Sequence, residues 1–224
     1  MYISDKIRDK YNGYFGLDGE TVYLTSNIDR KPFEIIDTSK PVITYFGNIG
    51  IGRNKSLRSI ADALWKINTE YRLEIYSNET DDDVLSVIDN QPNIFCGGSI
   101  PYADVMVRMK QSDITVIVEG FEECDIEFSR YSLSTKAADA LASGVAILVY
   151  GSSECGIVEY MQSTEAAEVC TEKESLVNSI KRLMDDAKLQ KQYYDKQIEV
   201  TQRNHTLRAS CDVAEMVINR ALQK

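Results

Sequence analysis

Three glycines and two cations follow an apolar segment in "YFGNIGIGRNKSL", in the order Gly47, Gly50, Gly52, Arg53 and Lys55. Glycines let the backbone approach a ligand closely, and the free N–H groups of a following helix favour anions. A tight turn alone would use the same glycines, but the added arginine favours a phosphate ligand. The spacing fits neither the dinucleotide pattern G-x-G-x-x-G nor the G-K-[ST] of a P-loop.

A second candidate is the start of "STKAADALASG", with Ser134, Thr135, Lys136 and Asp139. Either hydroxyl could cap a helix by accepting a hydrogen bond from its first turn. A cation in a first helical turn costs ~0.3–1 kcal/mol against the helix dipole unless an anion lies there too. A diphosphate between Lys136, the hydroxyls and the amides would remove that cost, with Asp139 nearby to accept hydroxyls of a sugar or ribose. The alternative is a solvated lysine beside a simple cap.

Carboxylates form a third group. Glu119 ends the apolar run "ITVIVEG", the position where a functional carboxylate would stand, and we expect the acidic residues after it to form a solvated loop (Glu122, Glu123, Asp125 and Glu127). Consecutive aspartates at 81–83 are more typical of a helix cap than of a metal site. No metal site is predicted.

The remaining bulk features describe an ordinary globular chain. It has 224 residues, 43% hydrophobic and 27% charged, with a formal charge of −10, which argues against nucleic acid as a partner. Five scattered cysteines without C-x-x-C pairs indicate free thiols, and His205, the one histidine, is expected to be structural. No leader or apolar run of ~18 residues is present, so we expect a cytoplasmic location.

The elements that must position these side chains alternate along the chain. Short apolar runs typical of buried strands occur in "TVYLTSN", "VITYFG", "YRLEIYS", "NIFCGG", "ITVIVEG", "AILVYG" and "AAEVC". Helical patterns separate them and continue to the end; "DDDVLSVIDN" is one, opened by its aspartates. This predicts an α/β fold: a doubly wound, Rossmann-like parallel sheet with helices on both faces and a C-terminal helical segment. Ligands of such sheets bind beside the loops that follow the strands.

The order "YFGNIGIGRNKSL … NIFCGGSIPYADVMVRMKQSDITVIVEGF … STKAADALASGVAILVYG" resembles the C-terminal, donor-binding half of GT-B glycosyltransferases. It is most similar to family 4, the glycosyl transferases group 1 type. The resemblance runs from about residue 21 to the end, where "YLTSNID" is similar to the strand that leads into that domain. It implies one Rossmann-like donor-binding domain over 1–224, with a lead-in helix and strand in 1–36 and C-terminal helices in 190–224.

The resemblance also implies roles for individual residues. The donor would be a nucleoside-diphosphate sugar, with no cofactor or metal, and transfer would retain the anomeric configuration. Glu119 matches the first of the family's paired glutamates, which contact the donor sugar and the ribose, and serves here as the candidate catalytic residue. Asp139 stands where the second is expected. The other donor-binding candidates are Gly47, Asn48, Gly50, Arg53, Ser99, Ile100, Ser134, Thr135 and Lys136, of which Ser99 and Ile100 would contact the nucleobase.

The sequence departs from the family in three ways. Glu119 and Asp139 are twenty positions apart rather than eight, and the second is an aspartate. Asn48 stands where many members have arginine. The acceptor domain is missing from these 224 residues, so we expect it from the same full-length chain or from a partner chain. Peripheral membrane association through that half stays compatible with the sequence.

Two other functions stay open at this point. The same GT-B halves occur in nucleotide-sugar epimerases, and a nucleotide or sugar-phosphate binding module without catalysis would need the same cradle. A flavodoxin-like or receiver-type signalling domain fits poorly, because the chain is too long and no acidic pocket follows its first strand. The sequence therefore favours a transferase half that acts in polysaccharide or glycoconjugate biosynthesis.

Overall fold

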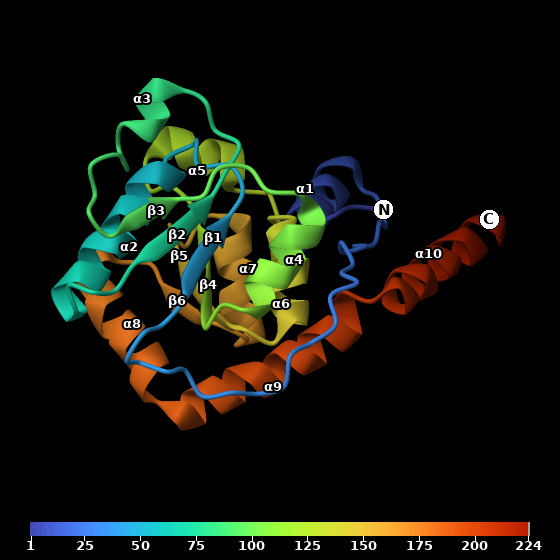
Figure 1. Cartoon of the computed structure of the whole chain (residues 1–224). Coiled ribbons are helices and arrows are strands. Elements are labelled where there is room, and N and C mark those ends of the chain that lie inside the picture. The colour runs from blue at the N-terminus through green and yellow to red at the C-terminus, as the bar shows by residue number, and fades with distance from the viewer. Residues whose placement is uncertain (224) are drawn as a thin grey trace.

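A six-stranded, all-parallel sheet forms the centre of the computed structural model, which describes residues 1–223 (Figure 1). The strands are β1 Ile43–Phe46, β2 Leu73–Tyr76, β3 Ile94–Cys96, β4 Ile114–Val118, β5 Ala146–Tyr150 and β6 Glu168–Cys170. Their order is β3-β2-β1-β4-β5-β6, so the winding reverses between β1 and β4. Ile43 of β1 pairs with Leu73 on one side and Ile114 on the other. A crevice at such a reversal is where open α/β sheets bind ligands.

Helices cover both faces of this sheet (Figure 1). The helices are α1 Asp5–Phe15, α2 Arg53–Ile67, α3 Asp82–Leu85, α4 Tyr102–Lys110, α5 Glu123–Ser129, α6 Lys136–Ser143, α7 Gly156–Thr164, α8 Leu176–Asp185, α9 Ala187–Asn204 and α10 Leu207–Leu222, with a 3₁₀ turn at Lys173–Ser175. On one face α2 and α8 pack together, and on the other α6 packs against α4 and α9. The predicted α/β, doubly wound architecture is confirmed.

The buried strands explain this arrangement. Every residue of β4 is buried, and successive side chains point to opposite faces. Val116 and Val118 belong to the core shared with α2 and α8, whereas Ile117 belongs to the core shared with α6 and α7. Continuous apolar runs of this kind are typical of parallel strands with helices on both sides. This packing fixes where each strand ends and where the loop after it begins.

The predicted strand "TVYLTSN" is wrong. Residues 22–36 have no regular structure, and just before them Thr21 forms one isolated bridge with Tyr2. Their amides bond to the ends of helices: Ser26 N donates to His205 O at 3.2 Å, and Lys31 N to Ser143 O at 2.9 Å. Val22 N still donates to Tyr2 O beside the bridge, but beyond it these hydrogen bonds go to helix ends and not to a strand of the sheet, so the segment forms a strap instead of a seventh strand.

The acidic stretch after β4 is also different from the prediction. It forms α5 instead of a solvated loop, and α5 begins with a capping box in which Glu122 and Asp125 each bond the other's backbone amide. Asp125, Ile126 and Ser129 are buried. The predicted helix at residues 81–90 forms only as the one-turn α3, and Asp81 caps it as expected by accepting from Asp83 N at 2.9 Å.

The C-terminal helices form as predicted. The long α9 lies against α6 and the edge of β5, and α10 then extends away from the sheet (Figure 1). Gln197 on α9 is buried, and its amide nitrogen donates to Val145 O and Ala166 O at 3.1 and 3.2 Å. None of the helices in residues 1–223 is both long enough and apolar enough to span a membrane.

Candidate anion-binding site

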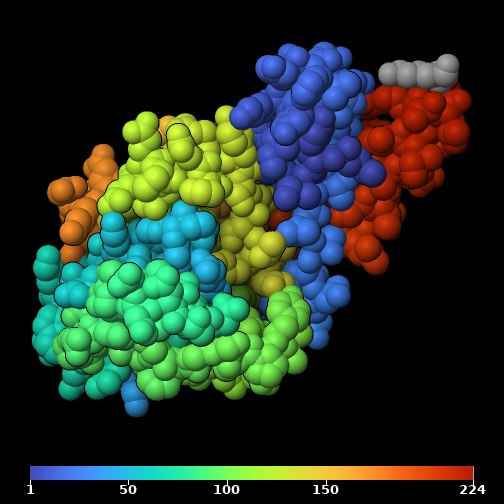
Figure 2. Space-filling view, turned by 90° about the horizontal axis from the view of Figure 1, so that it is seen from above, coloured from blue at the N-terminus to red at the C-terminus, as the bar shows by residue number. Residues whose placement is uncertain are grey.

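The loops that follow β1 and β4 begin side by side, because these two strands are neighbours in the sheet. The segments that carry them (light blue and yellow-green) meet on the side of the molecule seen in Figure 2. Gly47 directly follows β1 and has a φ of +119°. A Cβ atom added there would lie 2.7 Å from Nζ of Lys136, so position 47 has no room for a side chain. Glycine therefore serves both the backbone angle and the close approach of the lysine.

Lys136 is the first residue of α6, and its side chain extends to Tyr45 of β1. Its ammonium donates to the hydroxyl of Tyr45 at 3.1 Å and lies 4.8 Å from the centre of the same ring. Burial, with a smaller contribution from the cation of Arg53, lowers the pKa of Lys136 to about 8, although Glu119 acts in the opposite direction. Lys136 is therefore a desolvated lysine with little compensation from anionic side chains. This is the electrostatic setting expected of a site that binds an anionic ligand.

Arg53, the first residue of α2, forms an ion pair with Glu119 at the end of β4. Its NH2 group lies 2.8 Å from Oε2 of Glu119, and its Nε donates to the same oxygen at 3.0 Å. The side chain of Glu119 is 4% exposed and that of Arg53 is 15% exposed. Burial raises the pKa of Glu119 above its usual value, while the Arg53 cation opposes that rise. The pair joins the start of α2 to the end of β4 at the reversal point of the sheet.

The side chain of Asn48 organises the glycine-rich loop. Its Oδ1 accepts from Gly50 N at 2.9 Å and from NH1 of Arg53 at 3.4 Å. Its own carbonyl oxygen accepts from the Tyr45 hydroxyl at 2.5 Å. Asn48 therefore shapes the loop that carries Arg53, whereas a cationic residue at this position would bring charge.

Gly52 caps α2 and has a φ of +69°. A Cβ there would lie 2.0 Å from Oδ2 of Asp125, so α5 packs directly onto the glycine-rich loop. A hollow of about 420 Å³ lies beside this contact, with Lys55, Phe121 and Tyr150 in its lining. Lys55 forms an ion pair with Glu122 at 2.6 Å.

The two hydroxyl residues do not act as the predicted cap. Thr135 precedes α6 but already has helical angles, φ −58° and ψ −28°, and its side chain makes no capping hydrogen bond. A capping side chain normally extends from a β-region residue. In the first turn of the helix, the amide of Ala137 donates to the backbone carbonyl of Ser134 at 3.0 Å and not to a side chain. Thr135 is exposed and Ser134 is half-buried.

Asp139 is hydrogen-bonded to the strap and to α4. Its carboxylate accepts from the hydroxyl of Ser26 at 2.6 Å and from that of Tyr102 at 2.9 and 3.0 Å. Burial and the Asp139 carboxylate raise the pKa of Tyr102 to about 12. Ser99 and Ile100 lie in the loop just before α4, the first exposed and the second half-buried. The structure thus groups Asp139 with this loop and Lys136 with the glycine-rich loop.

The other candidate groups take structural roles. His205 is 1% exposed and bonds the Tyr160 hydroxyl at 2.8 Å and Leu24 O at 2.7 Å, and burial lowers its pKa. All five cysteines are free. Ligand atoms of Glu122, Cys124 and Asp125 lie within 4.8 Å of one another, but Glu122 is paired with Lys55 and Asp125 belongs to the capping box.

Two side chains at this site escaped the sequence reasoning. Tyr45 is hydrogen-bonded to Lys136, and Tyr102 is hydrogen-bonded to Asp139. The sequence around each tyrosine shows only an ordinary strand or helix residue. The hydrogen-bond partners of both are distant in the chain. Only the strand order brings each tyrosine next to its partner.

Comparisons with known proteins now identify the fold. The family described as "Glycosyl transferase-like" matches residues 53–214. A search of curated proteins finds no match. Among solved structures, WaaG, a glycosyltransferase involved in lipopolysaccharide biosynthesis, superposes with a TM-score of 0.66 at 14% identity, over 96% of this chain and 61% of that one. TarM gives 0.71 at 13% identity, over 97% and 42%.

Two further structures agree. Sucrose-phosphate synthase from Thermosynechococcus elongatus gives a TM-score of 0.68 at 13% identity, over 99% of this chain and 58% of that one. The C-terminal domain of a Francisella tularensis glycosyl transferase group 1 protein, LpcC, gives 0.58 at 13% identity, and this chain covers 99% of it. The chain spans about three fifths of WaaG and two fifths of TarM. It belongs to the glycosyl transferase-like family and has the fold of the C-terminal domain of GT-B, group 1 glycosyltransferases.

Proposed function

We propose that this chain binds the nucleoside-diphosphate sugar donor of a glycosyltransferase and that the whole enzyme acts in polysaccharide or glycoconjugate biosynthesis. The observation that carries the proposal is the meeting of Arg53, Lys136 and Glu119 where the sheet reverses direction. Two cations, a glycine loop and two helix starts converge there. Among structural neighbours, one TarM structure contains UDP, and a trehalose-6-phosphate protein from E. coli is bound with UDP-2-fluoro glucose.

The chemistry follows from these positions. Breaking the bond between the anomeric carbon and the diphosphate leaves negative charge on the departing diphosphate. Arg53, Lys136 and the amides at the start of α6 would stabilise that charge, and fixed donors of this kind are usually the largest catalytic contribution. Glu119 would orient the donor sugar, and transfer would retain the anomeric configuration. A second polypeptide region would bind the acceptor.

Asp139 has a less direct place in this proposal. Both of its oxygens are engaged by Tyr102, and one also by Ser26. Tyr102 is 58% exposed, so its hydroxyl can leave when a ribose hydroxyl replaces it. Ser99 and Ile100 in the same loop would then lie beside the nucleobase.

Nucleotide titration tests the proposal. UDP, GDP and ADP are added separately to the purified chain, and melting is followed by calorimetry. A nucleoside diphosphate at 100 times its Kd stabilises the fold by about 2.7 kcal/mol, which is easily measured. The corresponding nucleosides, which lack phosphates, serve as controls. If no diphosphate raises the melting temperature above its nucleoside, the proposal is wrong.

A further inference from the structure

A polar hollow of about 350 Å³ lies between α1, the start of the strap, α7 and the junction of α9 with α10. It is separate from the candidate anion-binding site, since its lining includes none of Arg53, Lys136 and Glu119. Pockets that bind small molecules begin at about 300 Å³, so the hollow is large enough for a small organic ligand. Six of its lining residues carry hydroxyl groups: Thr21, Tyr23, Tyr160, Ser163, Thr164 and Ser210.

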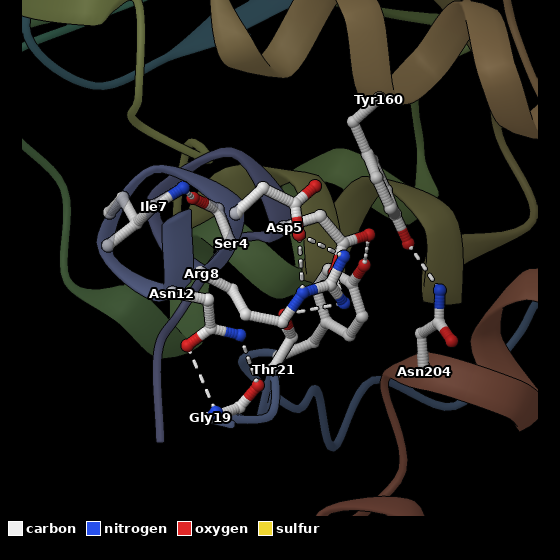
Figure 3. A network of polar contacts seen from close by, with 11 residues as sticks. Ser4, Asp5, Ile7, Arg8, Asn12, Gly19, Thr21, Tyr160 and Asn204 are labelled. Carbon is white, nitrogen blue, oxygen red and sulfur yellow. Dashed lines mark hydrogen bonds and ion pairs between the residues drawn. The ribbon is translucent and has the colours of Figure 1, made fainter. Parts of the chain in front are cut away.

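The two charged residues that α1 contributes to the hollow neutralise each other. Asp5 accepts from NH1 of Arg8 and from the Thr21 hydroxyl, each at 2.7 Å (Figure 3). The Tyr23 hydroxyl also donates to Asp5, and Nε of Arg8 donates to Asp9 at 2.8 Å. Because both charged groups are already paired, this wall of the hollow offers a ligand no unbalanced charge.

Arg203 supplies the positive charge of the hollow. It is an exposed residue in the last turn of α9, and it forms no ion pair with any of the described residues 1–223. Glu199, one turn earlier, is paired with Lys196 at 2.9 Å. Glu20 of the lining is paired with Arg220, also at 2.9 Å. A guanidinium without a carboxylate partner favours a ligand with a phosphate or carboxylate group, which it can bind bidentately.

The serine hydroxyl groups of the hollow have already donated their protons to the backbone. Ser163 donates to Tyr160 O at 2.8 Å, and Ser210 donates to Tyr23 O at 3.2 Å. A hydroxyl oxygen has two lone pairs, so both serines can still accept hydrogen bonds. They therefore favour a ligand that carries hydrogen-bond donors.

The Tyr160 hydroxyl has donated its proton in the same way. Nδ1 of His205 lies 2.7 Å from Leu24 O and must donate to it, because a carbonyl oxygen only accepts. Burial lowers the pKa of His205, so its ring is neutral at neutral pH and Nε2 accepts from the Tyr160 hydroxyl at 2.8 Å. Nδ2 of Asn204 donates to the same hydroxyl at 2.9 Å (Figure 3). Oδ1 of Asn204 is then a further acceptor for a ligand.

We propose that this hollow binds a sugar that carries a phosphate or carboxylate group. The anionic group would bind Arg203, and the sugar hydroxyls would donate to the oxygens of Ser163, Ser210 and Asn204. A neutral sugar would leave the charge of Arg203 unmatched, and an inorganic anion would leave the acceptors unmatched. An amine would satisfy the acceptors, but Arg203 would repel its positive charge. The site goes beyond the proposed donor site and does not depend on it.

Calorimetric titration of the purified chain tests this proposal. The probes are the 6-phosphates of glucose, galactose and mannose and the corresponding uronates, and the controls are the parent sugars and inorganic phosphate. We expect at least one charged sugar to bind about tenfold more tightly than either control, because only a charged sugar uses both Arg203 and the acceptors. The phosphate series and the uronate series distinguish the two anionic groups.

Two arginine variants locate the bound sugar. Arg203→Ala should weaken its binding by about tenfold or more, whereas Arg208→Ala should leave it unchanged. Arg208 is the matched control, since it lies at the start of α10, has a side chain that is 92% exposed and does not line the hollow. Neither substitution should alter the melting-temperature shift caused by nucleoside diphosphates.

A competition experiment and NMR separate this site from the donor site. Excess UDP should leave the affinity for the charged sugar unchanged. In chain with isotope-labelled tyrosine, the charged sugar should shift the ring signals of Tyr160 and not those of Tyr45.

Four results would overturn the proposal: no charged sugar binds more tightly than its controls, UDP displaces the sugar, the Tyr45 ring shifts in place of the Tyr160 ring, or Arg203→Ala binds the sugar as tightly as Arg208→Ala. A wild-type chain whose melting temperature does not respond to nucleoside diphosphates would instead count against the proposed donor site alone.

Discussion

The ammonium group of Lys136 lies 3.1 Å from the hydroxyl of Tyr45, and among residues 1–223 no carboxylate forms an ion pair with it. An α6 residue and a β1 residue 91 positions apart thus meet across the sheet edge. The lysine charge is desolvated and faces the cation of Arg53. Without an anion, the position costs stability, and a bound diphosphate would relieve that cost.

The contribution of Lys136 to the stability of the ligand-free chain should therefore rise with pH in the alkaline range. The pKa of Lys136 is lowered from 10.5 to about 8 in the folded state, so the unfolded chain binds more protons between these values. Stability rises with pH wherever the unfolded state binds more protons. Urea unfolding at pH 7.5 to 10 measures this as the difference between the wild-type chain and Lys136→Met: the free energy of unfolding of the wild-type chain should gain on that of the variant as the pH rises. An equal slope in both proteins would contradict the assignment.

Arg53→Lys keeps the charge but loses the planar fork that contacts Glu119. We expect the affinity for a nucleoside diphosphate to fall roughly 10- to 150-fold, because hydrogen bonds to charged groups contribute about 1.5–3 kcal/mol. Isothermal calorimetry measures the change. Lys55→Ala is the matched control, since Lys55 lies two positions further on and is paired with Glu122, and it should change affinity less than threefold. A loss of affinity greater than threefold in Lys55→Ala would indicate that the diphosphate binds near Lys55 and not at Arg53.

Gly47→Ala should both destabilise the chain and displace Lys136. The new methyl group would lie 2.7 Å from the ammonium, on a backbone with a φ of +119°, and strained positions of this kind cost about 1–3 kcal/mol. Gly13→Ala is the opposite case: nothing lies within 4 Å, and the residue is inside α1, so stability should rise by about 0.5–1 kcal/mol. Thermal unfolding compares the two, and equal effects would refute the close contact.

Asp139→Asn tests the link between α6 and α4. Tyr102 loses the carboxylate that, after burial, raises its pKa to about 12, so its titration should move back toward 10. NMR of the labelled Tyr102 ring follows this directly. Tyr193, whose pKa is raised by burial and by Glu168, should not move. A Tyr102 pKa unchanged by the substitution would show that the hydrogen bond does not form in solution.

The sequence predicted the sheet well because buried parallel strands leave an unmistakable signature. The runs "VITYFG" and "ITVIVEG" became β1 and β4, and the glycine loop and Lys136 fell at helix starts as expected. The strap at residues 22–36 was missed because its extended, half-apolar pattern is that of a strand. The strap differs from a strand in its hydrogen-bond partners, which lie on distant helices and cannot be predicted from the local sequence.

The helix α5 was missed for a related reason. Its acidic residues suggested solvent, but Asp125 is turned inward against Gly52 and Gly120, and its neighbour Ile126 is buried. Similarly, the hydroxyl groups of Tyr102 and Ser26, which bond the Asp139 carboxylate, could not be read from the sequence around Asp139. Spacing along a helix gives the face of a residue, whereas its partner depends on what packs there.

The ion pair between Arg53 and Glu119 has one consequence for how a ligand arrives. The guanidinium charge is already balanced by a carboxylate that is 4% exposed, so of Arg53 and Lys136 only the lysine would meet an incoming diphosphate without an ion-pair partner among residues 1–223. When the diphosphate binds, Arg53 would exchange Glu119 for a phosphate group, and the charge of Lys136 would be neutralised. Such a site would attract its ligand weakly from a distance and hold it mainly through contacts made on arrival.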